Sequence, residues 1–355
     1  MSPYLSITLL LLLAGALFVL PLTPALAEFV RKSDATPLNV IQDYTGEIRV
    51  FADGFRSYIK SLEPALRDSA NSDAPATGIL PDGTRYLVVG HSDKGLKLPF
   101  DQRNICPVLI AASEDLELPS DAAFSKEIYA AGHLVGGEKG RYRAILGEKD
   151  VHLGPASSVL RWAHAVGEFR ADQGCKLYGR ASSDQCLSLQ RNCSFQRLNA
   201  PRIEIAAHTS EKPLSLANAA AEADSRSLQR LLIDGNFSLD RGETLTGNLV
   251  VRGSLRIGAG ARIFGDLKGG KRVILEDNVS VQGSLISNRE LRIGPNCAIQ
   301  GPIIAERFLH IQSGTQCGSP EHPTTVSAPW IEVEERAVVF GTLWAREHGQ
   351  VVAKS

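Results

Sequence analysis

Three consecutive segments decide the fold: GNLVVRGSLRIGAGARIF (residues 247–264), GDLKGGKRVILEDNVSVQ (265–282) and GSLISNRELRIGPNCAIQ (283–300). They follow one another without a gap. A glycine opens each segment and the one after it, so glycines recur every 18 residues at Gly247, Gly265, Gly283 and Gly301. Glycine lets the backbone bend sharply at the same point of each repeat. A fixed period of this length indicates a stack of similar turns, each of which buries its apolar face only against its neighbours.

Within each segment, apolar residues recur two positions apart, which is typical of half-buried strands and excludes helices. The predicted interior residues are Leu255 with Ile257, Val273 with Leu275, Leu291 with Ile293, and Ile299. At about 3.3 Å per residue, 18 residues trace a circuit of roughly 60 Å, which is the perimeter of a three-sided coil. The sequence therefore predicts an all-β fold, a single-stranded parallel β-helix with about 18 residues per rung.

The same template extends in both directions along the chain. Val151, Phe169 and Leu187 are again 18 residues apart. We therefore predict one solenoid from about Leu98 to Leu343. From residue 96 onward, the chain is predicted to consist of degenerate rungs at 96–206, an Ala-rich insertion at 207–228, regular rungs at 229–345 and a tail at 346–355.

The amino-terminal segment 5–27 contains no charged residue, and about 20 apolar residues suffice to cross a bilayer. We predict a transmembrane anchor at 1–30. The alternative is a cleaved signal peptide, because Ala25, Leu26 and Ala27 resemble a processing site. Arg31 and Lys32 follow the apolar run and no basic residue precedes it, which favours a cytoplasmic location for the rest of the chain over a periplasmic one.

A neck and linker at 31–95 carries a short amphipathic helix, which begins near Pro37 and should end or kink at Pro64. Its apolar residues alternate between spacings of three and four, at Ile41, Tyr44, Ile48, Phe51, Phe55, Ile59 and Leu62. We expect this face to dock on the adjoining domain and cover its first layer; the alternative is self-association as a coiled coil.

Composition excludes several function classes. The 38 basic and 39 acidic residues give a formal charge of −1, so no field attracts nucleic acid. Six cysteines include no CxxC pair, and no ligand set for a metal is visible. Cys175 and Cys193 are one period apart, and stacked rungs place them farther apart than a disulfide prefers, so we predict buried thiols.

The repeats from Leu231 to Leu343 resemble the bactofilin family of polymer-forming bacterial cytoskeletal proteins, with weaker similarity back to Leu98. The resemblance implies a right-handed β-helix, end-to-end self-association, no nucleotide or other cofactor, and a role in organising envelope or cell-shape machinery. The amino-terminal span and the insertion depart from the family. The prediction is a single-pass protein of the bacterial inner membrane, a scaffold and not an enzyme, whose partners are itself and envelope or polysaccharide-synthesis proteins. The end around Leu343 to Val352 is expected to be the more open one.

The alternative is a hexapeptide-repeat acyltransferase with a left-handed β-helix, because 18 is also three hexapeptides. Such an enzyme would use a histidine as a general base, and His208 and His322 lie in the two breaks of the period. Neither histidine has an acidic partner in a recognisable motif, so we predict no catalytic residue.

Overall fold

The computed structural model describes residues 49–71, 75–90, 98–206 and 230–354, together with isolated positions before residue 24. The chain divides into two compact units, Met1–Glu47 and Ile48–Ser355, and the folded body belongs to the second. No helix among the described residues is both long enough and apolar enough to cross a bilayer. The predicted span at 5–27, the first part of the neck, and His208 with the insertion at 207–228 fall outside the described residues, apart from those isolated positions.

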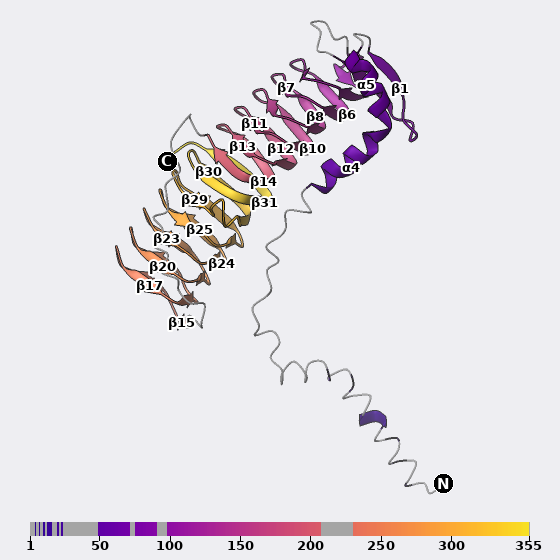
Figure 1. Cartoon of the computed structure of the whole chain (residues 1–355). Coiled ribbons are helices and arrows are strands. Elements are labelled where there is room, and N and C mark those ends of the chain that lie inside the picture. The colour runs from indigo at the N-terminus through magenta and orange to yellow at the C-terminus, as the bar shows by residue number, and fades with distance from the viewer. Residues whose placement is uncertain are drawn as a thin grey trace. The chain divides into compact units, whose positions relative to one another are not determined.

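The body is a parallel β-solenoid of about 12 turns, as the period predicts. Its strands form two stacks (Figure 1). The first stack opens with the hairpin β1 (Ala76–Ile79) and β2 (Arg85–Val89). It continues through β3 (Ile105–Cys106), β4 (Leu109–Ala112), β5 (Leu116–Glu117), β6 (Ala123–Ala130), β7 (Leu134–Gly136), β8 (Arg141–Gly147), β9 (Val151–Leu153), β10 (Ser158–Ala165), β11 (Phe169–Ala171), β12 (Lys176–Ser183), β13 (Cys186–Leu189) and β14 (Ser194–Ile205).

The second stack has three short strands per turn. They are β15 (Arg230–Ile233), β16 (Phe237–Leu239), β17 (Thr244–Thr246), β18 (Asn248–Val251), β19 (Leu255–Ile257), β20 (Arg262–Phe264), β21 (Leu267–Gly269), β22 (Val273–Leu275), β23 (Ser280–Val281), β24 (Leu285–Ser287), β25 (Glu290–Ile293), β26 (Ala298–Ile299), β27 (Ile303–Ala305), β28 (Phe308–Ile311) and β29 (Gln316–Cys317). The long strands β30 (Thr324–Glu334) and β31 (Val338–Val352) complete it, so residues 346–352 are part of β31.

The strand register follows the 18-residue period. Leu255 pairs with Val273, and Val273 with Leu291, each 18 positions on. Val151, Phe169 and Leu187 pair in the same way in the first stack. The interior residues singled out from the sequence are all buried: Leu255, Ile257, Val273, Leu275, Leu291, Ile293 and Ile299.

The repeated glycines lie where rungs touch. Gly247 and Gly265 have φ of +132° and +148°, in the left-handed half of the map that side chains disfavour. A Cβ on Gly283 would overlap the carbonyl of Gly265 in the rung below, and one on Gly301 would overlap the backbone of Gly283. Only a residue without a side chain fits this column.

The two stacks run in opposite directions, which corrects the prediction of one continuous solenoid. β14 closes the first stack, β31 closes the second, and these two last strands pair with each other antiparallel. Figure 1 shows β14 and β31 side by side in the middle, with β1 and β15 at the two far ends. A uniform sequence period fixes how each rung stacks, but it carries no information about which end meets which.

A helical segment made of α4 (Val50–Ile59), η3 (Lys60–Leu62) and α5 (Glu63–Asn71) packs on the first stack. Its buried residues Ala52, Phe55, Ile59 and Leu62 contact outward side chains of the stack, among them Leu109 and Trp162. The prediction that this face docks is therefore confirmed for Phe55, Ile59 and Leu62, whereas Phe51 is 41% exposed and the residues before 49 lie outside the described part of the chain. The face covers the flank of several rungs and not only the first layer. Pro64 does not end the segment; it lies in the first turn of α5, where proline is tolerated.

Candidate assembly surfaces

The junction between β14 and β31 joins the two stacks. Backbone hydrogen bonds cross it at both margins: Arg336 N donates to Ile205 O at 2.7 Å, and Val351 N donates to Cys193 O at 2.8 Å. Side chains add Asn199 Nδ2 to Thr342 Oγ1 at 2.9 Å. The terminal rungs thus satisfy each other's edge groups, which would otherwise be exposed.

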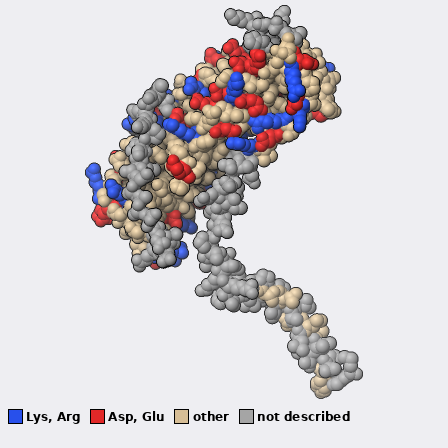
Figure 2. All heavy atoms as spheres, viewed as in Figure 1, with Lys and Arg blue, Asp and Glu red and all other residues tan. Residues whose placement is uncertain are grey.

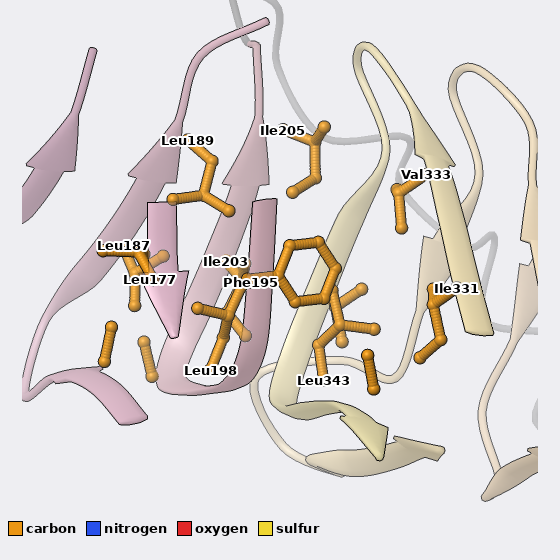
Figure 3. Close-up of a cluster of buried hydrophobic side chains, with 14 of the residues drawn as sticks. Leu177, Leu187, Leu189, Phe195, Leu198, Ile203, Ile205, Ile331, Val333 and Leu343 are labelled. Atoms are coloured by element: carbon orange, nitrogen blue, oxygen red, sulfur yellow. The ribbon is translucent and has the colours of Figure 1, made fainter. Parts of the chain in front are cut away.

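The core is continuous through this junction. Figure 3 shows the ring of Phe195 lying between the stacks, with Ile203 and Ile205 on one side and Val333 and Leu343 on the other. All five side chains belong to one buried cluster. The end around Leu343 to Val352, expected to be open, is therefore covered on both sides, by β30 and by β14. The prediction was wrong because the sequence does not reveal that another terminal rung faces this one.

The opposite end of the second stack is a different surface. Within the described residues, β15, β16 and β17 pair on one side only, with β18, β19 and β20. Leu231 pairs with the buried Leu249, yet it remains 46% exposed because no described strand lies beyond it. This unpaired, partly apolar rung edge is a template for another strand.

The far end of the first stack ends in the hairpin. β1 pairs antiparallel with β2, and β2 pairs parallel with β4. The hairpin turn is fixed by Asp82, whose Oδ1 accepts a hydrogen bond from Thr84 N at 2.9 Å. This bond, helped by the Tyr58 hydroxyl, lowers the pKa of Asp82. β1 has only four residues, and its Ile79 is 66% exposed.

A polar cluster beneath α4 has the composition of a catalytic triad. His164 Nδ1 lies 2.9 Å from Ser182 Oγ, and His164 Nε2 lies 3.8 Å from Asp184 Oδ1. In a catalytic triad the serine contacts Nε2 and the carboxylate contacts Nδ1, which is the reverse of the arrangement here. His164 is also only 2% exposed, so a substrate does not reach it. Burial lowers the pKa of His164; Asp184 opposes this, and Arg56 and Arg49 add to it. His164 and Ser182 were not among the predicted site residues, although their 18-residue offset, one period of the repeat, is readable in the sequence.

The remaining candidate residues are separate from one another. His322 is exposed on a turn, where its backbone N–H donates a hydrogen bond to Ser319 Oγ at 3.1 Å. All six cysteines are free thiols, and Cys175 and Cys193 are both buried. Burial raises the pKa of Cys297 and of Cys317 to about 12. Among the residues that the structure describes, no three metal-binding side chains converge.

Charge does not single out a binding face either. On the face seen in Figure 2, basic and acidic side chains alternate over the first stack. Several are paired, such as Arg143 with Glu127 across rungs at 2.9 Å and Arg56 of α4 with Glu148 of the first stack at 2.7 Å. Such alternation gives no strong potential of one sign.

Comparison with known proteins gives no relative: no family model matches the chain, and neither a curated protein nor a solved structure matches it.

Proposed function

We propose that this chain is a self-associating structural scaffold of the bactofilin kind, built on a right-handed β-helix. The supporting observation is the junction of β14 and β31. It is an end-on contact between two terminal rungs, made within one chain, with a continuous apolar core and paired edges. A fold that forms this contact internally has the chemistry to form a related one between molecules wherever a rung edge is left unpaired.

The edge at β15–β17, which no described strand pairs, is the surface that would carry association. Leu231 and Phe237 provide apolar contact there, and the strand edges provide hydrogen-bonding groups. The hairpin end is a poorer candidate because β1 is short, and short edge strands resist further pairing.

Residues 5–27 would anchor the scaffold in the bacterial inner membrane, with the solenoid on the cytoplasmic side; the charge-free run followed by Arg31 and Lys32 supports this orientation. Envelope or polysaccharide-synthesis proteins are the proposed clients. Protease accessibility of the solenoid in spheroplasts tests the side: protection supports the cytoplasmic placement, and digestion supports the periplasmic one.

The test of self-association is light scattering and negative-stain microscopy of the full chain. We expect assemblies larger than one chain, and we expect Leu231→Lys to dissolve them, because the charge sits on the strand edge and can still reach solvent. The matched control is Ile79→Lys at the other end. A chain that is monomeric at all concentrations contradicts the proposal, and loss of assembly in the control alone moves the interface to the hairpin.

A further inference from the structure

One line of outward side chains runs from strand to strand along a single flank of both stacks; we call it the flank column. In the first stack it comprises Glu127, Ala144, Trp162 and Arg180. It crosses the junction through Arg197, which pairs with Trp344. The column thus joins two regions far apart in the sequence into one surface.

In the second stack, the flank column continues through Ser327, Ile304, Ile286, Lys268, Val250 and Leu232. Except at Leu232 in the end strand β15, the neighbours of these residues along each strand point inward and are buried, as Leu285 and Ser287 are on either side of Ile286.

A helix covers the first half of this column. Phe55 of α4 meets Trp162 edge to face, with 5.5 Å between ring centroids, and Ala144 and Trp162 are buried as a result. The described part of the covering helix begins near β12, where Arg49 pairs with Asp184 at 2.8 Å and Arg180 lies over the Phe51 ring at 4.7 Å.

The second half has no such cover among the described residues. Leu232 is 52% exposed and Trp344 39%, and Val250, Ile286 and Ile304 are half-buried. The next face of the same stack is different: its outward line reads Arg256, Ile274, Arg292 and His310. Apolar side chains therefore gather on the flank that binds α4 and not on its neighbour.

The dimensions of the free half suit a helix. From β14 to β15 there are eight strands and so seven spacings of about 4.8 Å, or roughly 34 Å. A helix of that length has about 22 residues, the same as Val50–Asn71 on the covered half. A strip roughly 10 Å wide gives about 340 Å², well short of the approximately 800 Å² per partner of a stable protein pair.

The charges within this strip specify the partner further. From Arg197 to Leu232, the charged residues of the flank column are Arg197 and Lys268, both basic. Arg197 lies over the Trp344 ring at 5.1 Å, so a cation and an apolar surface are adjacent there. A ligand with acidic groups beside an apolar stripe would complement the basic residues and the apolar surface of the strip.

We propose that the free half of the flank column binds an amphipathic helix of a partner protein. The helix places its apolar stripe on Ile286, Ile304 and Trp344 and its acidic residues near Lys268, in the manner of α4 on the first stack. The site shares only Leu232 with the edge at β15–β17; the residues that carry it, Ile286, Ile304 and Trp344, lie in other strands, and binding there does not depend on self-association.

The test uses fluorescence anisotropy with the full chain and a labelled synthetic peptide. The probe is the sequence of residues 50–71 with Arg56→Glu, Lys60→Glu and Arg67→Glu, which retains the apolar stripe. The control peptide also carries Phe55→Ser, Ile59→Ser and Leu62→Ser. The protein variants are I286E/I304E on the column and Ile274→Glu on the neighbouring face, each checked for folding by circular dichroism.

We expect saturable binding of the probe at micromolar concentration, weakened at least tenfold by I286E/I304E and by the control peptide, and unchanged by Ile274→Glu. Binding that persists in I286E/I304E would overturn the proposal, since it would mean exchange with α4. Absence of saturable binding would also overturn it. So would a drop in the sedimenting mass of the chain on I286E/I304E alone, which would assign the strip to a second copy.

Discussion

The ring of Phe195 lies directly over Gly349, so closely that a Cβ on Gly349 would overlap the ring. Phe195 is in β14 and Gly349 is in β31, so this contact locks the last rung of one stack onto the last rung of the other. The junction is therefore not a loose abutment of two domains but a packed core with complementary shapes.

The first prediction concerns this contact. Gly349→Ala should lower the free energy of unfolding by about 1–3 kcal/mol, because overpacking forces Phe195 or the strand to move. Denaturant unfolding measures the change. Gly54→Ala in α4 is the matched control, since nothing lies within 4 Å of its Cβ position and alanine favours a helix. Equal stability of the two variants would show that the junction is not tightly packed.

The second prediction concerns the rung interior. Ile293→Asp should abolish the folded state, because its neighbours are apolar and a buried unpaired carboxylate costs more than about 4 kcal/mol. Arg292→Asp is the control: Arg292 is adjacent, points outward and is exposed. Circular dichroism and protease resistance distinguish the two. A folded Ile293→Asp chain with an unchanged spectrum would mean that the rung register is wrong.

The rung register could be predicted from sequence because it depends on local alternation and a fixed period, as at Leu255, Val273 and Leu291. The site of helix docking left a readable signal. Leu109, Ile110, Ala111 and Ala112 of β4 are all apolar and all buried, which indicates cover on both faces of the strand. The antiparallel junction of the two stacks left no signal in the sequence, because Leu343 and Ala345 resemble the interior residues of any other rung.

The third prediction concerns the thiols. With the pKa of Cys297 and Cys317 each at about 12 and that of Cys186 at about 11, almost no thiolate exists at pH 8. The side-chain interaction with Cys193, and next the burial of the thiol, raise the pKa of Cys175 as well. Iodoacetamide at pH 8 should therefore label these cysteines only after denaturation, as read by peptide mass spectrometry. Rapid labelling of Cys297 in the native chain would contradict its burial.

The fourth prediction concerns His164 under α4. Its pKa is lowered, mainly by burial, whereas in the unfolded chain it is about 6.5. Below pH 6.5 the unfolded state therefore binds more protons than the folded state. The free energy of unfolding then decreases as the pH is lowered, by up to about 1.4 kcal/mol per pH unit, until the folded pKa is passed. Above pH 7 the effect disappears.

His164→Gln keeps a neutral hydrogen-bonding group beside Ser182 and removes the titration. Its free energy of unfolding, measured by urea denaturation between pH 7 and 5, should depend less on pH than that of the native chain. His322→Gln, on the exposed turn, should retain the native profile. If His164→Gln and the native chain lose stability in parallel, the acid sensitivity belongs to other groups, and the contact of α4 with this flank is indifferent to the charge of the histidine beneath it.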